Sequence, residues 1–144
     1  MTTEVQAAAE EAQVYKRPAN LRGPIPYIGS KDGPEQAQFY VKAFGGKILN
    51  EQFAEDGKRY MHCCIEIAGG HVMMSDAFPE FGHPYEEPKN LSIFIPSDNP
   101  QADFDRAVAA GCEVTMPMAV QFWGDRYGQL KDPWGIIWSI GGPA

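Results

Sequence analysis

The stretch SKDGPEQAQFYVKAFGG, residues 30–46, has a second copy in PSDNPQADFDRAVAAGC, residues 96–112. Asp32 recurs as Asp98, and three more residues recur at the same offset of 66, namely Pro34, Ala43 and Gly45. The match extends beyond this stretch: Ile48 corresponds to Val114, Gly69 to Gly135, and, at an offset of 67, Arg59-Tyr60 to Arg126-Tyr127. A repeat of this length that occurs twice predicts two copies of one supersecondary unit about a pseudo-twofold axis, rather than a solenoid.

Each copy carries the signals of a helix with a defined start and end. Asp32 can cap the free amides, and Glu35 is placed as its capping-box partner. Apolar residues follow at helical spacing, and they are Ala37, Tyr40, Val41 and Phe44. Gly45 then ends the helix. The second copy repeats this plan, with a capping box at residues 98–101, a stop at Gly111 and a stripe made of Phe104, Ala107 and Val108.

Short apolar or alternating runs flank each helix and predict strands. In the first unit the expected strands are residues 25–28, 47–53, 60–67 and 71–75. In the second unit they are residues 91–95, 113–117, 119–123 and 136–140. Each unit is therefore expected to be a β-α-β-β-β module.

The predicted fold is α+β, with two modules in a pseudo-twofold repeat that form a curved mixed sheet around a cleft. One domain would span residues 23–142, in which module one is 24–78, a proline-rich connector is 79–89 and module two is 90–142. Residues 1–22 would form an N-terminal extension, in which residues 2–12 could make a short helix.

The composition of the chain argues against several classes of partner. A formal net charge of −7 without any basic block disfavours nucleic acid and anionic membranes as partners. The chain has neither a membrane-length apolar run nor the pattern of a secretory signal, so we expect a cytoplasmic protein. Three cysteines, of which Cys63 and Cys64 are adjacent, are unsuited to a disulfide framework and fit a reducing compartment.

Three runs carry a resemblance to a known family. The closing run KDPWGIIW at 131–138 is similar to the ending of the vicinal oxygen chelate superfamily, which includes glyoxalases, bleomycin-resistance proteins and extradiol dioxygenases. The runs VMMSD at 72–76 and FWGDRYG at 122–128 resemble its PhnB-like branch. The resemblance implies the paired-module fold over residues 24–142 and a homodimer.

The resemblance also implies a divalent metal, held by side chains from the first and fourth strands of each module. Carried onto this chain, these positions fall at residues 25–26, 91–92, Met73 and Ser139. None of them is His, Asp or Glu, and a hydroxyl or thioether alone does not hold a hard cation in water. We therefore expect no cofactor and no metal at the usual positions.

A relocated metal site is the alternative. His62 and Glu66 share one strand face, and His71 lies on the next strand, so these three could bind zinc in a metal-dependent lyase or ring-cleaving dioxygenase. The other interpretation makes His62 and Glu66 the polar face of a strand. Its buried face would then be Met61, Cys63, Ile65 and Ile67.

The polar-aromatic run from Trp123 to Gly128 permits two interpretations. Arg126 could bind an anion while Trp123 and Tyr127 stack on a flat ligand. Alternatively, the run is a tight turn that Asp125 caps and Gly128 bends. No nucleophile elbow or phosphate-binding glycine loop is present.

The sequence thus predicts a protein that binds a small, partly aromatic or anionic molecule in its cleft, and it leaves catalysis open. The candidate ligand-binding residues are Met73, Ser75, Asp76, Trp123, Arg126, Tyr127 and Ser139. A structural protein that docks through its N-terminal extension is a third possibility.

Overall fold

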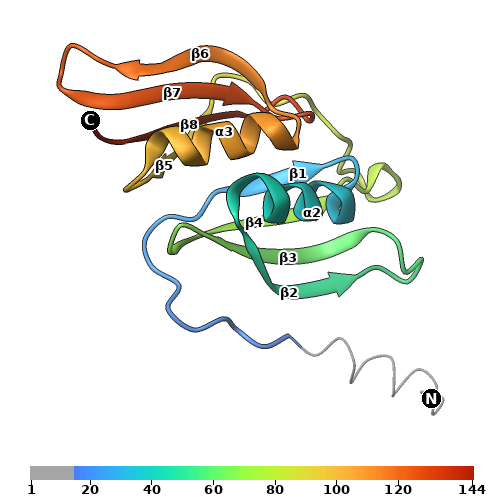
Figure 1. Ribbon diagram of the computed structural model, residues 1–144. Helices are drawn as coiled ribbons and strands as arrows, with labels where there is room; N and C mark the ends of the chain where they lie inside the picture. Colours follow the sequence, from blue (N-terminus) through green and yellow to red (C-terminus); the bar gives the residue numbers. More distant parts are fainter. Residues whose placement is uncertain (1–14) are drawn as a thin grey trace, which may run out of the picture.

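The computed structural model describes residues 15–144 (Figure 1), so the expected helix at residues 2–12 lies outside the described part. The first module consists of β1 (Tyr27–Ser30), α2 (Gly33–Phe44), β2 (Lys47–Phe53), β3 (Tyr60–Ile67) and β4 (Gly70–Asp76). The second consists of β5 (Ser92–Pro96), α3 (Pro100–Ala110), β6 (Glu113–Val120), β7 (Asp125–Lys131) and β8 (Ile137–Pro143). A short 3-10 helix, η1 (Pro79–Phe81), lies in the connector.

The two modules have the same topology. Sheet one has the strand order β1-β4-β3-β2, and sheet two has the equivalent order β5-β8-β7-β6. In each sheet the first and last strands of the module pair in parallel, and the other pairs are antiparallel. The predicted α+β class and the repeated β-α-β-β-β plan are confirmed.

The helix boundaries follow local chemistry. Asp32 Oδ1 accepts a hydrogen bond from the Glu35 amide at 3.2 Å, and Gly45 closes α2 in the left-handed region at a φ of 66°. The second capping box, predicted at residues 98–101, is wrong. The residue before α3 is Asn99, whose side chain caps nothing, and Ser97 Oγ instead accepts from the Asn99 amide at 3.0 Å.

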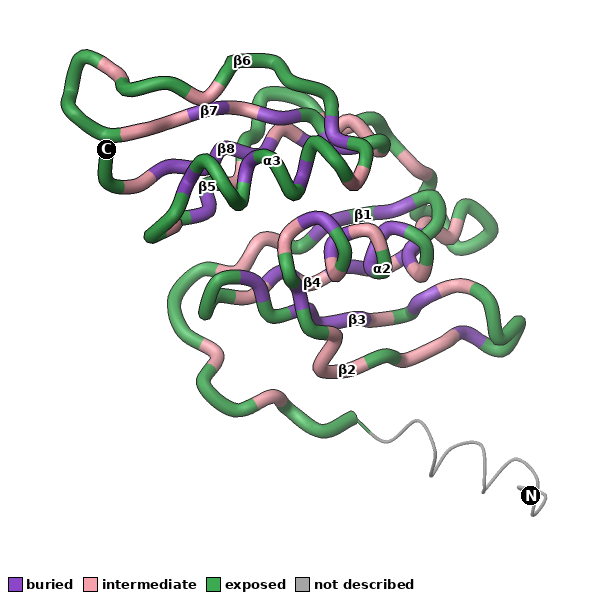
Figure 2. Tube along the Cα trace, in the orientation of Figure 1, coloured by how far each residue is buried: buried purple, intermediate pink, exposed green. Residues whose placement is uncertain are grey.

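One core joins the helix-facing sides of both sheets, and its buried residues form stripes along helices and strands (Figure 2). Trp138 of β8 is fully buried, with its ring centroid 5.0 Å from that of Tyr40 and 4.5 Å from that of Phe44 on α2. The helices also pack against each other. Each sheet therefore has one face on the shared core and one face turned away from the helices, which we call its outer face.

Met61 departs from the predicted buried face of β3, because its side chain is 60% exposed. Gln52 is paired with His62 and Phe53 with Tyr60, which leaves Met61 as an extra residue on β3. Such a β-bulge breaks the alternation of a strand and turns the unpaired side chain outwards. The alternation resumes beyond it, where Cys63, Ile65 and Ile67 join the core as predicted.

The third strand of module two was predicted wrongly. Residues 113–117 and 119–123 were expected to be separate strands, but a single strand, β6, runs through Pro117. β6 is an edge strand, where a residue without an amide donor is tolerated. The chain turns at Gly124, and residues 125–131, which include the expected tight turn, form β7. Gly128 lies inside this strand, where an added Cβ would come within 2.8 Å of Phe104 on α3.

The described part of the N-terminal extension lies on the outer face of sheet one. The ring centroids of Tyr15 and His62 are 5.5 Å apart, and the Asn50 side-chain amide donates to the Lys16 carbonyl at 3.4 Å. Residues 15–26 thus run alongside the first module before β1 begins (Figure 1). Within residues 15–144, no helix has the length and apolarity needed to cross a membrane.

Candidate functional site

The outer face of sheet one gathers polar side chains from four strands. Tyr27 is opposite Met73 in the β1–β4 pair, and Met73 is opposite Cys64 in the β4–β3 pair. Neighbouring residues with the same orientation complete the face, and they are Asn50, His62, His71 and Ser75. Tyr27 is 56% exposed, and its hydroxyl lies 2.8 Å from His62 Nδ1. Phenol, imidazole, amide and hydroxyl groups therefore share this surface.

Three polar atoms on this face are buried and make no hydrogen bond to another described residue. They are Asn50 Oδ1, His62 Nε2 and His71 Nε2. A buried polar atom without a partner costs about 1–3 kcal/mol, which is why such atoms are rare in folded proteins. Burial also lowers the pKa of His62, so its neutral imidazole is favoured. A molecule that reaches these atoms gains hydrogen bonds that the chain itself does not use.

A cavity of about 440 Å³ lies beside this face, where the parallel strands β1 and β4 end. Its lining combines strand residues with the connector, and includes Tyr27, Ser75, Asp76, His83, Tyr85 and Leu91. The volume is within the range of small-molecule sites. The structure thus brings the predicted residues Ser75 and Asp76 to one cavity, and Met73 to the adjoining sheet face.

Asp76 has a structural task in this arrangement. Its side chain points towards the helix side, where Oδ1 accepts from the Gly33 amide at 2.7 Å and Oδ2 from the Tyr60 amide at 2.6 Å. Burial raises the pKa of Asp76, while these two amide donors lower it. The Gly33 bond fixes the start of α2, so the carboxylate holds helix and sheet together.

The outer face of sheet two carries an aromatic shelf, which we define as Phe94, Phe122, Trp123 and Tyr127. The Phe94 and Tyr127 rings stack at 12° with centroids 6.3 Å apart, and Trp123 meets Tyr127 edge-on at 5.6 Å. Phe122 is 97% exposed. Phe94 can lie flat because Gly141 is below it, where an added Cβ would come within 3.0 Å of its ring.

The structure divides the predicted residues of module two. Tyr127 and Ser139 lie on the outer face, and Ser139 is buried between Phe94 and Gln129 in the strand register. Arg126 precedes Tyr127 on β7, so its side chain takes the opposite direction. No hydrogen bond or ring contact between described residues joins Tyr127 or Ser139 to Met73 or Ser75.

Sequence reasoning missed Tyr27, His62 as its partner, and Phe94. Tyr27 and Phe94 could have been found by alternation, because each is next to a buried isoleucine and must point to the other face of its strand. The contact between Tyr27 and His62 spans 35 residues of sequence. It depends on how β4 separates their strands, which no local pattern reports.

The residues present do not fit the divalent metal that the fold implies. Met73 and Ser139 are on outer faces at the positions carried over from the family, and they offer a thioether and a hydroxyl. No group of three or more His, Cys, Asp or Glu side chains in residues 15–144 is placed to hold a metal ion.

The relocated metal site is not formed either. Glu66 is paired with His71, but His62 is four residues further along β3, or about 13 Å at the rise of a strand. That spacing prevents the three side chains from meeting at one ion, whose ligands lie about 2 Å away.

The cysteines do not provide a nucleophile. Cys63, Cys64 and Cys112 are free thiols, and all three are buried. Burial raises the pKa of Cys63 and of Cys112 to about 12, and it also raises the pKa of Cys64. A thiol is reactive as its thiolate, and the raised pKa values disfavour that form in all three side chains.

The fold and the two outer faces define a paired β-α-β-β-β protein whose sheets are free of helices on one side. Residues 26–140 match the model of the Glyoxalase/Bleomycin resistance protein/Dioxygenase superfamily, and the chain belongs to that family. The uncharacterized protein Rv0887c of Mycobacterium tuberculosis is 36% identical over 124 residues, which are 82% of this chain and 72% of that protein.

Solved structures share the fold. Protein PA1353 from Pseudomonas aeruginosa superimposes with a TM-score of 0.68 and 25% identity, over 83% of this chain and 96% of its own. A PhnB protein from Bacillus cereus superimposes with a TM-score of 0.59 and 15% identity, over 84% of this chain and 99% of its own. The second likeness concerns the fold alone, and it is consistent with the PhnB-like resemblance.

Proposed function

We propose that this protein binds a small, partly aromatic or anionic molecule at the outer face of sheet one, without the divalent metal of its family. The observation that carries the proposal is the set of three buried, unused polar atoms on that face, namely Asn50 Oδ1, His62 Nε2 and His71 Nε2. Tyr27 of the same face, whose hydroxyl lies 2.8 Å from His62 Nδ1, lines a cavity of about 440 Å³ that is large enough for such a ligand.

The chemistry of the face suits oxygen-bearing ligands. A neutral imidazole can donate from one ring nitrogen and accept at the other, and the Tyr27 hydroxyl can do both. Tyr27 and His62, which lie within hydrogen-bond distance of each other, can therefore donate to a carboxylate or phosphonate oxygen without a metal. Leu91, Pro84 and Ile136 give the adjoining cavity apolar walls, against which a flat ring can pack.

A second copy of the chain is the proposed protein partner. The aromatic shelf of sheet two exposes Phe94 by 54%, Trp123 by 51% and Phe122 by 97%. Contiguous exposed apolar side chains of this kind mark interaction sites. In a homodimer the partner subunit would cover this shelf. The aromatic rings of the shelf would then add stacking groups to a ligand bound at the interface. Phe122→Ser should then shift the chain towards monomer in light scattering.

The three free thiols fit a protein of the reducing cytoplasm.

The test is a thermal-shift titration of the full chain with benzoate, 2-naphthoate and phenylphosphonate in the presence of a chelator. A ligand that binds only the folded state raises the melting temperature in proportion to its occupancy. The proposal expects at least one of these acids to stabilise the wild type, and expects His62→Ala to abolish the effect. The matched control is Gln38→Ala, an exposed change on α2, which should keep it. No stabilisation of the wild type by any acid would contradict the proposal.

A further inference from the structure

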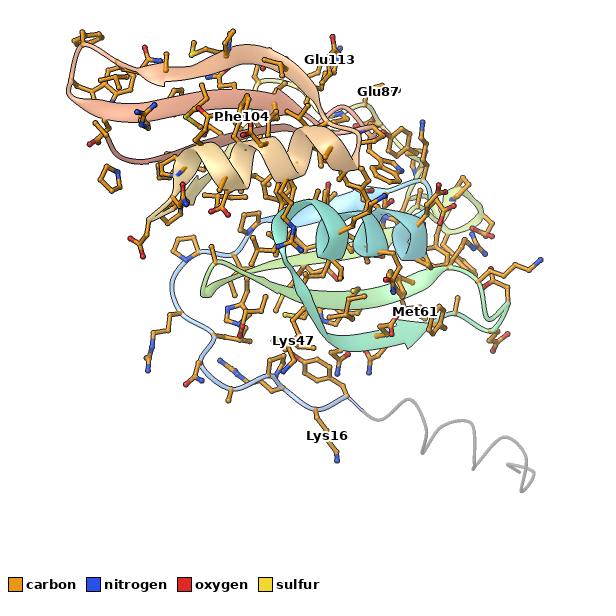
Figure 3. The ribbon with its side chains drawn as sticks, viewed as in Figure 1. Lys16, Lys47, Met61, Glu87, Phe104 and Glu113 are labelled. Atoms are coloured by element: carbon orange, nitrogen blue, oxygen red, sulfur yellow. The ribbon has the colours of Figure 1, made fainter. Side chains whose placement is uncertain are left out.

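A second cavity lies outside the outer faces, between the β2–β3 turn and η1. Its volume is about 660 Å³. Its walls combine apolar and charged side chains, namely Ala54, Glu55, Arg59, Met61, Phe78 and Phe81. Met61 is 60% exposed and Phe81 is 73% exposed. Figure 3 shows Met61 near the turn that joins β2 to β3, on the first module.

The exposed phenylalanine sits on a rigid support. Phe78 and His83 exchange backbone hydrogen bonds of 2.7 and 3.0 Å, which close the short loop that contains η1. The Phe78 and Phe81 rings lie 6.3 Å apart within this loop. Met61 is held on the opposite wall by the β-bulge of β3. Backbone geometry thus directs both apolar side chains to exposed positions at the cavity.

Arg59 is fully engaged in building this cavity. Its guanidinium forms a two-pronged contact with Glu80, at 2.8 and 3.0 Å, and donates from Nε to Asp56 at 2.7 Å. It also lies 4.4 Å from the centroid of the Phe78 ring. These contacts use its fork and one of its flat faces. Arg59 therefore has little left to offer an anionic ligand.

The charge of the rim is negative. Glu55, Asp56 and Glu80 line the cavity together with one arginine, which leaves a net charge of −2 from these four groups. Hydrogen bonds from the Arg59 and Lys58 amides lower the pKa of Asp56 to about 2, and the Arg59 side chain lowers the pKa of Glu80. Both carboxylates are ionised at neutral pH. Glu55 is the carboxylate for which the structure shows no bond to Arg59.

We propose that this cavity binds a small hydrophobic amine. The apolar body of the amine packs between Met61 and Phe81, and its ammonium group lies at the carboxylate rim near Glu55. Aromatic faces attract cations, and methionine adapts its shape to varied apolar ligands, so both walls favour this class. The site adjoins the cavity of the proposed acid-binding face, because His83 lines both, but it has the opposite charge preference.

The experiment follows the methionine methyl signals of the full chain by NMR during titration with 2-phenylethylamine. The neutral comparison is 2-phenylethanol and the anionic one is 3-phenylpropionate. Met61→Leu assigns the reporter at this cavity, and Met73 serves as the internal reporter of the outer face. The proposal expects a saturable shift of the Met61 signal that is strongest with the amine and weakest with the acid. The Met73 signal should stay unmoved by the amine.

Glu55→Gln isolates the charge term without touching the Arg59 network. It should weaken amine binding about two- to fivefold, as expected for an exposed ion pair, and leave the alcohol unaffected. The matched control is Glu113→Gln, the same charge change on β6 of the other sheet (Figure 3). Equal shifts with all three probes, no saturable shift of Met61, or an unchanged amine affinity in Glu55→Gln would each overturn the proposal.

Discussion

The Tyr40 hydroxyl on α2 donates a hydrogen bond of 2.5 Å to Asp132, 92 residues further along the chain in the second module. The indole of Trp138 donates to the same carboxylate oxygen at 2.9 Å. Gln36 donates its amide to the Tyr40 hydroxyl at 2.6 Å, and accepts from Ser30 at the same distance. This buried polar chain ties the start of module one to the closing turn of module two.

Tyr40→Phe should lower the free energy of unfolding by about 1–3 kcal/mol, because the Gln36 amide loses its buried acceptor and Asp132 loses a donor. The measurement is chemical denaturation followed by circular dichroism. The control is Tyr85→Phe, which removes a hydroxyl that makes no hydrogen bond to another described residue. Equal stability of the two variants would mean that the chain of hydrogen bonds does not hold the modules together.

Asp76→Ala should destabilise the fold by about 2–4 kcal/mol, because the Gly33 and Tyr60 amides would both be buried without an acceptor. Asp98→Ala, an exposed change just before α3, should alter stability by less than about 0.5 kcal/mol. The sequence predicted Asp76 as a ligand-binding residue, and the same variant tests that prediction. Unchanged stability together with lost acid binding would instead support Asp76 as a ligand-binding residue.

Local signals in the sequence predicted most elements of the fold, but not the contacts that Asp76 makes. The helix signals and the repeat predicted both modules, and β2 and β3 have the expected bounds because glycine-containing turns delimit them. The role of Asp76 depends on amides 43 and 16 residues away, which only the assembled fold brings near. The β6 strand was divided in two because Pro117 suggests a break, although an edge strand accepts it.

The candidate site was predicted only in part, because some of its residues are brought together by pairing between strands. Met73 and Ser75 alternate along β4, so the sequence could place them on one face. The unused atoms of Asn50, His62 and His71 come from three strands that meet only in the sheet. The Met61 bulge likewise depends on pairing with β2, which no single-strand pattern contains.

The native thiols should resist 5,5′-dithiobis(2-nitrobenzoate) at pH 8. With the pKa of Cys63 and Cys112 raised to about 12, only about one thiol in ten thousand is ionised at that pH. Denaturation in urea should release all three cysteines of the chain to the reagent. Fast modification of native protein would contradict the burial of these groups.

Deletion of residues 1–22 should expose one thiol selectively. Cys64 is on the outer face of sheet one, yet it is fully buried, and residues 15 and 16 contact His62 and Asn50 on the same face. Mass spectrometry after labelling should find Cys64 modified in the shortened chain and Cys63 protected by the core. If Cys64 stays protected as well, the extension is not what covers this face.

Stability should fall in weak acid through His62. Burial lowers its pKa in the folded chain below the ordinary value of 6.5. A lowered pKa stabilises the fold above pH 6.5, and this contribution is lost as the pH falls through the folded-state value. The melting temperature should therefore drop between pH 7.5 and 5.5, and drop less in His62→Gln. Parallel pH profiles of the two proteins would exclude His62 as the cause.

Acid binding at the outer face of sheet one should need no metal. Isothermal titration of the full chain with the most stabilising of the three acids tests it directly, before and after exhaustive chelation with EDTA and with elemental mass spectrometry of both samples. We predict the same dissociation constant in both samples, with no stoichiometric metal in the chelated one. Binding that disappears on chelation and returns with zinc, manganese, nickel or iron would contradict metal-free binding.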